Sequence, residues 1–145
     1  MSTIKVDTYL TRGGASEIAI DKLKGVTAAG SMLVVGEGGS TTTNLQQGLA
    51  KMWCTHSQAA SYTLDDSFNV ASIADNGLGE TTITFTNAPA NANYAVNITS
   101  GHANQRTIFN SNNTTRVKCE TYEVDNVTNP VDTADVCTTV HGDLA

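Results

Sequence analysis

Short runs of alternating apolar and polar residues dominate the chain from about residue 63 to its end. The pattern is clearest in residues 80–99, where Ile83 and Phe85 are two apart and Tyr94 and Val96 repeat that spacing. A period of two places such residues on one face of a strand and the intervening Thr and Asn residues on the other. This stretch therefore predicts two strands, each with one dry and one wet face, joined by a turn that contains Pro89.

Further strands are expected on both sides of this pair, with Gly-, Asn- and Pro-containing turns between them. Many short strands at short intervals are typical of a small antiparallel sandwich or barrel. The expected strands cover residues 67–74, 105–109, 114–124 and 134–142 in this region, and 4–10, 17–20 and 31–35 nearer the N-terminus.

The first 42 residues differ in texture, since they contain few large apolar residues and a glycine-rich segment at 36–39. A piece of about 40 residues normally needs staples or oligomerisation to fold. No pair of cysteines is present there to supply a disulfide. We therefore expect residues 1–42 to form an extended arm that docks on, or intertwines with, other chains.

Residues 43–54 contain the best helix candidate, which Thr43 can cap. The apolar residues fall at i, i+4, i+7 and i+8, which is one helical face. Gly48 weakens this helix by roughly 1 kcal/mol relative to Ala. Two interpretations stay open: the face packs on the sheet of its own chain, or it associates with two further copies about a symmetry axis. The residues of this predicted oligomer interface are Leu45, Leu49, Met52 and Trp53.

Charge and hydropathy narrow the possible partners. The net charge is −6, and eight Lys and Arg residues are scattered along the chain, which argues against binding to nucleic acid. No apolar run of 18 residues or more occurs, so no transmembrane helix is expected. The N-terminus lacks the apolar segment of a signal peptide. We expect synthesis in a cytoplasm, followed by retention there or release by lysis.

The cysteines and histidines are isolated from one another in sequence, without CxxC, HxH or HExxH spacing. We therefore predict no metal site and expect the cysteines to be buried free thiols. In a trimer, His56 or His141 could still meet its copies on the axis and bind an ion. The residues concerned are Cys54, Cys119, Cys137, His56, His102 and His141.

Catalytic signatures are sparse. Asp65 and Asp66 are adjacent, and adjacent residues on a strand point to opposite faces, so they do not form a carboxylate pair for acid–base chemistry. The sequence contains no nucleophile elbow, P-loop or dinucleotide-binding fingerprint. We therefore expect no enzymatic activity, no catalytic residues and no cofactor.

The segment 100–113 is rich in side chains that form hydrogen bonds. Such groups can bind sugar hydroxyls, although an ordinary polar loop has the same composition. The candidate receptor- or glycan-binding residues are His102, Asn104, Gln105, Arg106 and Asn112.

Three segments carry a resemblance to a known family. Residues 66–96 (DSFNVASIADNGLGETTITFTNAPANANYAV) look like a module found in tail-fibre and other structural proteins of marine tailed bacteriophages. Residues 43–53 (TNLQQGLAKMW) are similar to the helix that leads into that module, and residues 140–145 (VHGDLA) to its usual ending. The resemblance covers roughly residues 40–145.

The resemblance implies a homotrimeric virion appendage that contacts the host surface, and it brings no catalytic residues. In that family the module often closes a much longer fibre, whereas few residues precede it here. We therefore expect a short tail or head fibre. A capsid decoration protein that stabilises the shell and a carbohydrate-binding β-sandwich are the alternatives.

The expected architecture is mainly β, in two parts. Residues 1–42 form an attachment arm, and residues 43–145 form a short helix followed by a small, jelly-roll-like antiparallel β-sandwich, in a homotrimer. The expected partners are other copies of the chain, phage tail or capsid proteins that bind residues 1–42, and a host surface glycan or protein. The expected location is the virion, assembled in the host cytoplasm.

Overall fold

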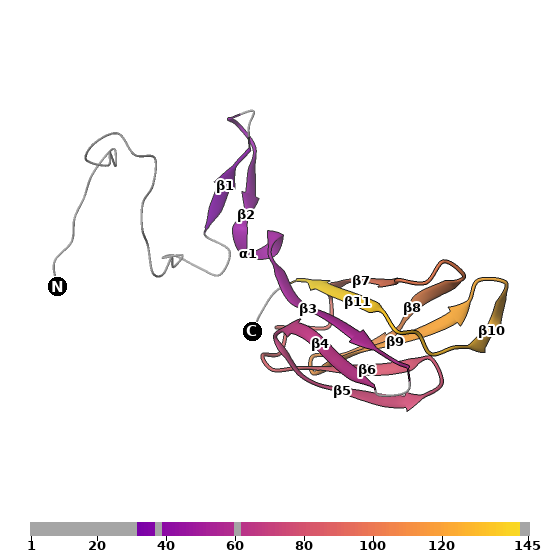
Figure 1. Cartoon of the computed structure of the whole chain (residues 1–145). Helices are drawn as coiled ribbons and strands as arrows, with labels where there is room; N and C mark the ends of the chain where they lie inside the picture. Colours follow the sequence, from indigo (N-terminus) through magenta and orange to yellow (C-terminus); the bar gives the residue numbers. More distant parts are fainter. Residues whose placement is uncertain (1–31, 37–38, 60–61, 143–145) are drawn as a thin grey trace, which may run out of the picture.

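Side chains along the central strands alternate between buried and accessible positions, which gives each sheet one inner and one outer face. A computed structural model describes residues 32–36, 39–59 and 62–142. Two antiparallel sheets pack face to face around a shared core (Figure 1). The predicted mainly β fold with antiparallel sheets is confirmed.

The four-stranded sheet has the order β4-β3-β11-β7, and the five-stranded sheet has the order β10-β9-β6-β5 with β8 also paired to β9. Every pairing is antiparallel. The strands of the sandwich are β3 (Ala50–Ser57), β4 (Thr63–Phe68), β5 (Val70–Gly77), β6 (Glu80–Phe85), β7 (Ala95–Ser100), β8 (Gln105–Asn112), β9 (Arg116–Glu123), β10 (Asn126–Pro130) and β11 (Val136–His141).

The core joins the inner faces of β3 and β11 to those of β6 and β9. Its buried apolar cluster comprises Met52, Cys54, Ile83, Phe85, Val117, Cys119 and Val140. Phe85 and Tyr94 meet edge to face at 5.8 Å between ring centroids, a favoured aromatic arrangement. The Tyr94 hydroxyl donates to the backbone oxygen of Asn113 at 2.9 Å, which satisfies its polar end.

Asn69 forms the corner at which the chain passes from β4 in one sheet to β5 in the other. Its φ of 60° is left-handed, a conformation that Asn tolerates better than most residues. Its side-chain amide donates to the backbone oxygens of Lys51 and Asn87, and its side-chain oxygen accepts from the Asn87 N–H. The predicted continuous strand over residues 67–74 is therefore wrong, because it is divided at this corner.

The predicted helix over residues 43–54 is also wrong. Helical structure is limited to α1 (Leu45–Gly48), and the chain continues as β3 from residue 50. From Met52 onward the burial pattern has a period of two, and β3 pairs with β4 on one side and β11 on the other. Pairing with two neighbours outweighs a helical pattern that Gly48 already weakens.

Two short strands, β1 (Leu33–Val35) and β2 (Thr42–Asn44), form a separate hairpin before the sandwich. Figure 1 shows this hairpin outside the two packed layers. It accounts for the strand predicted at 31–35, whereas the strands predicted at 4–10 and 17–20 lie outside the described residues.

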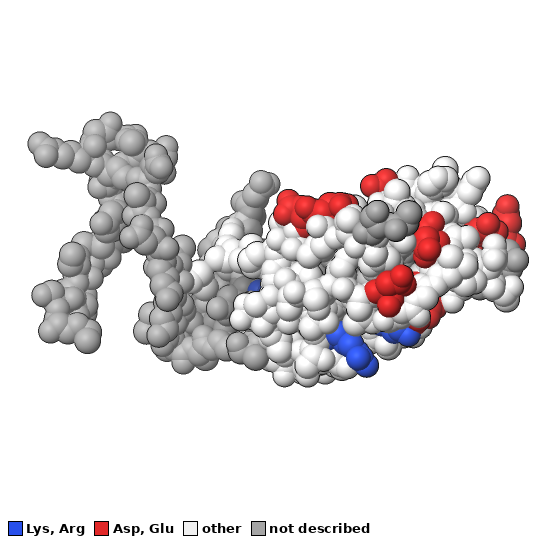
Figure 2. Space-filling model, turned by 60° about the horizontal axis from the view of Figure 1, so that its bottom comes forward, with Lys and Arg blue, Asp and Glu red and all other residues white. Residues whose placement is uncertain are grey.

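The surface is sparsely charged. Figure 2 shows acidic side chains dispersed over one face of the sandwich, with basic side chains confined to a smaller area. Lys118 and Glu80, on the neighbouring strands β9 and β6, form an ion pair. Within the described ranges, no helix has the length and apolar character needed to cross a membrane.

Candidate functional site

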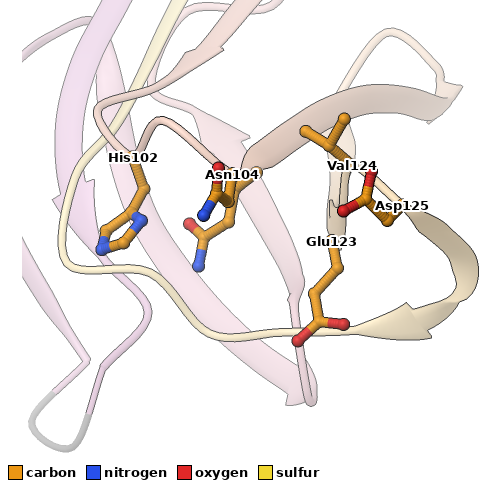
Figure 3. A pocket seen from close by; sticks show the side chains of 6 residues that line it. His102, Asn104, Glu123, Val124 and Asp125 are labelled. Atoms are coloured by element: carbon orange, nitrogen blue, oxygen red, sulfur yellow. The ribbon is translucent and has the colours of Figure 1, made fainter.

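An open cleft of about 280 Å³ lies between the turn from β7 to β8 and the turn from β9 to β10. Figure 3 shows His102 and Asn104 on one wall, with Glu123, Val124 and Asp125 on the other. The lining residues are His102, Asn104, Gln105, Glu123, Val124 and Asp125. Three of the five predicted receptor-loop residues are thus brought together here.

Backbone hydrogen bonds hold the two walls in place. The Val124 N–H donates to the backbone oxygen of Asn104 at 2.9 Å, so the two turns are joined directly. In the turn from β7 to β8, the Gly101 N–H donates to the backbone oxygen of Asp135 at 2.9 Å. A Cβ at Gly101 would lie 2.7 Å from the Cβ of Asp135, so this close approach requires glycine.

The side chains of the cleft suit a ligand that carries hydroxyl groups. The Ser100 hydroxyl donates to the side-chain oxygen of Gln105 at 3.2 Å and so orients this amide. The amides and the imidazole supply donors and acceptors, and the carboxylates of Glu123 and Asp125 supply acceptors. The described part of the chain contains no group of three potential metal ligands.

The remaining two predicted residues are not part of the cleft lining. Arg106 lies opposite Tyr122 in the pairing of β8 with β9. Asn112 is at the far end of β8, roughly 20 Å along the strand from Gln105 at about 3.3 Å per residue. Its amide donates to the backbone oxygen of Ala92 at 2.8 Å, which joins the end of β8 to the loop between β6 and β7. The five residues therefore do not form one site.

Sequence reasoning missed the second wall of the cleft. A turn after Val124 could be expected from the predicted end of the 114–124 strand. The pairing of β8 with β9, however, joins residues far apart in sequence, such as Gln105 and Glu123. Periodicity does not fix that register, so the two turns could not be placed side by side beforehand.

The four residues predicted to form an oligomer interface do not share a face. Met52 is fully buried in the core, whereas Trp53 is next to it on β3 and points to the outer face of the sheet. Leu49 is exposed and precedes β3, and Leu45 lies on the short helix α1. The predicted helical stripe is therefore replaced by separate positions, of which Leu49 and Trp53 remain accessible.

A buried polar cluster lies at one end of the core. His56, Gln58 and Thr81 are almost fully buried. The Gln58 amide donates to Thr81 Oγ1 and to the backbone oxygen of Gly79, both at 3.0 Å. The Nε2 atom of His56 lies 3.3 Å from the same Thr81 hydroxyl, and Tyr62 also forms a hydrogen bond with it. Burial lowers the pKa of His56 to about 4, although the nearby Asp65 opposes the change.

The burial of His56 bears on the axial ion site that a trimer could form. An imidazole buried inside the sandwich of its own chain does not lie on an outer surface where copies could meet. His56 is therefore not placed to meet its copies on an axis, whereas His141, half-buried at the end of β11, is not affected by this finding.

Two of the three cysteines are buried free thiols, as predicted, while the third is not. Cys54 and Cys119 lie in the core, where burial raises the pKa of their thiols to about 12 and about 11. Cys137 is a free thiol on the outer face of β11 and is exposed. The prediction of burial is wrong for Cys137, because its parity on β11 is opposite to that of buried Val136 and Thr138.

Comparison with known proteins gives no family model, curated protein or solved structure that matches this chain.

Proposed function

We propose that this chain is a structural virion protein of a tailed bacteriophage, a short tail or head fibre that exposes its sandwich for attachment to the host surface. The observation that carries the proposal is the division of the chain into a sandwich with its own core and a hairpin that lies outside it. The resemblance of residues 43–53, 66–96 and 140–145 to phage fibre modules supports the same conclusion.

The hairpin is suited to attachment. Its first strand exposes Leu33, Val34 and Val35, at 55, 49 and 60% of their surface. A two-stranded hairpin with three-residue strands is at best marginally stable in water, and contiguous exposed apolar residues mark interaction surfaces. We propose that residues 1–42 bind a tail or capsid protein and other copies of the chain, in a homotrimer.

The sandwich supplies the exposed head. Its cleft presents amide, imidazole and carboxylate groups from two turns that backbone hydrogen bonds hold together. These groups can bind a host surface glycan or protein, and they require no catalytic step or cofactor. The protein is assembled in the host cytoplasm and becomes external in the mature particle.

A capsid decoration protein is the second candidate, because the apolar hairpin also fits attachment to a shell. Decoration and attachment differ in what the purified protein binds: a fibre head binds host cells by itself, whereas a decoration protein binds intact capsids. A carbohydrate-binding module is the third candidate and is favoured by the cleft. Such a module would bind glycans without any particle.

The experiment uses full-length variants, so that the sandwich stays in its native context. Replacing Leu33 and Val35 with Ser should leave the sandwich folded and should abolish the homotrimer in light scattering and the incorporation into particles. The same replacement of Leu78, which is exposed in the turn from β5 to β6, is the matched control. A hairpin variant that assembles as well as wild type would overturn the attachment role of the arm.

A further inference from the structure

The outer face of the four-stranded sheet carries an exposed aromatic pair. Trp53 on β3 is directly opposite Phe68 on β4. Their Cβ atoms are therefore about 5 Å apart on the same face. The exposed fraction is 36% for Trp53 and 51% for Phe68. Two neighbouring rings thus lie open to solvent on a sheet whose inner face is fully used by the core.

Uncharged polar side chains continue this row across the sheet. Thr139 on β11 is paired with Trp53, and Asn97 on β7 is paired with Thr139. The row Phe68–Trp53–Thr139–Asn97 therefore crosses all four strands, with neighbouring strands about 4.8 Å apart.

A second row runs parallel to the first and has similar chemistry. It consists of Asp66, Thr55, Cys137 and Thr99. Asp66 is its one ionisable carboxyl group, and this group accepts a hydrogen bond from the Ser67 N–H at 2.8 Å. The two rows contain no Lys or Arg, so they combine two aromatic rings with hydroxyl, amide and thiol groups and a single carboxylate.

We propose that this face binds a neutral oligosaccharide lying across the strands. A sugar ring has an apolar C–H face and a rim of hydroxyls, which matches an aromatic ring bordered by Thr and Asn side chains. Trp53 and Phe68 stack on successive sugar rings, and Thr139 and Asn97 form hydrogen bonds with the hydroxyls of the next. The inference rests on the proposed attachment function, for which it names the ligand class.

The small apolar area and the charge of this face favour this ligand over others. The two rings together expose roughly 200 Å² at the stated exposures, so they would supply only about a quarter of the ~800 Å² that each partner buries in a stable protein interface. Asp66 and the net charge of −6 also disfavour an anionic sugar. The side-chain hydrogen bonds of Asn69 also fix the backbone corner next to Phe68 before any ligand binds.

The single tryptophan of the chain makes the proposal directly measurable. The protein is titrated with four neutral hexasaccharides while Trp53 fluorescence is recorded. The four sugars are α-linked glucose, β-linked glucose, mannose and N-acetylglucosamine. We expect at least one of them to change the emission saturably. Phe68→Ala should weaken that binding at least tenfold, and Trp53→Ala should abolish it in calorimetry. Ile108→Ala, an exposed position on the other sheet, should leave it unchanged.

Any of four outcomes would overturn the inference. None of the four sugars binds, or Phe68→Ala binds as well as wild type. A third outcome is that Trp53 emission changes with protein concentration in the absence of sugar, which indicates self-association, and that Phe68→Ala abolishes this self-association. That result would show that a second copy of the chain covers the face. Host-cell binding that survives Phe68→Ala but is lost in Asn104→Ala would refute the sheet-face site and retain the attachment function. Sugar binding through Trp53 by a protein absent from virions would refute the virion function instead.

Discussion

Protonation of His56 should destabilise the fold between pH 6.5 and pH 4. His56 is 0% exposed, and burial lowers its pKa from 6.5 to about 4 in the folded state. Within this pH window the unfolded chain binds a proton that the folded chain does not, so the free energy of unfolding falls as the pH falls. Above pH 6.5 the imidazole is neutral in both states, so the free energy of unfolding no longer changes with its protonation.

The magnitude follows from the shift itself. Each pKa unit corresponds to about 1.4 kcal/mol, so a shift from 6.5 to about 4 is worth roughly 3 kcal/mol. The loss should be complete near pH 4. This is a large fraction of the ~5–15 kcal/mol that stabilises a typical domain.

Urea denaturation from pH 7.5 to pH 4 measures this effect. His56→Gln keeps a polar group near Thr81 but does not titrate, so its free energy of unfolding should fall by roughly 3 kcal/mol less than that of wild type over the range. His102→Gln changes an exposed histidine and is the matched control, which should follow the wild-type profile. Equal pH dependence of wild type and His56→Gln would refute the reasoning.

Three further predictions concern the corner, a tight turn and the thiols. Asn69→Ala should lower the free energy of unfolding by about 2–4 kcal/mol in urea denaturation, because it loses the corner hydrogen bonds and strains a left-handed backbone. A decrease below about 0.5 kcal/mol would contradict the role of this corner. Gly79→Ala should be more destabilising than Gly77→Ala in the same assay. Both glycines have a positive φ, but only at Gly79 would a Cβ meet a backbone atom, at 2.5 Å. A larger loss of stability in Gly77→Ala would contradict this packing. In the native protein, iodoacetamide should modify Cys137 alone. After denaturation, mass spectrometry should detect modification of all three thiols. Rapid modification of Cys54 or Cys119 in the native protein would contradict their burial in the core.

Much of the sandwich can be read from the sequence because side chains alternate between inner and outer faces along its central strands, such as β6, β9 and β11. The spacing of Ile83 and Phe85 predicts that they share one face of a strand, and both are buried on the inner face of β6. The period of two is a local property, so it survives without knowledge of the partners of a strand. The strands predicted near residues 80–87 and 134–142 accordingly lie close to β6 and β11.

The errors arose where tertiary structure outweighed the local pattern. One helical face accommodates Leu45, Leu49, Met52 and Trp53, and no other segment of the chain fits a helix better. Pairing with β4 and β11 nevertheless places Met52 in the core and Trp53 on the outer face. Short apolar runs are ambiguous between helix and strand, and long-range pairing decides between them.

The candidate site was only half predictable for a related reason. The composition of residues 100–113 indicates five residues, of which His102, Asn104 and Gln105 line the cleft, whereas Arg106 and Asn112 do not. The register that brings the turn around Val124 beside Asn104 is a long-range property of β8 and β9. A polar loop in a sequence therefore locates one wall of a cleft and not the other.

Immunogold electron microscopy of particles purified from the lysate in which the chain is made tests the central proposal most directly. Antibodies are raised against the purified protein, and intact particles are labelled before imaging. The proposed function predicts gold on the outside of intact particles, on a tail or head fibre. Particles that carry no gold, and no copies of the chain when they are dissociated and probed with the same antibodies, would contradict it.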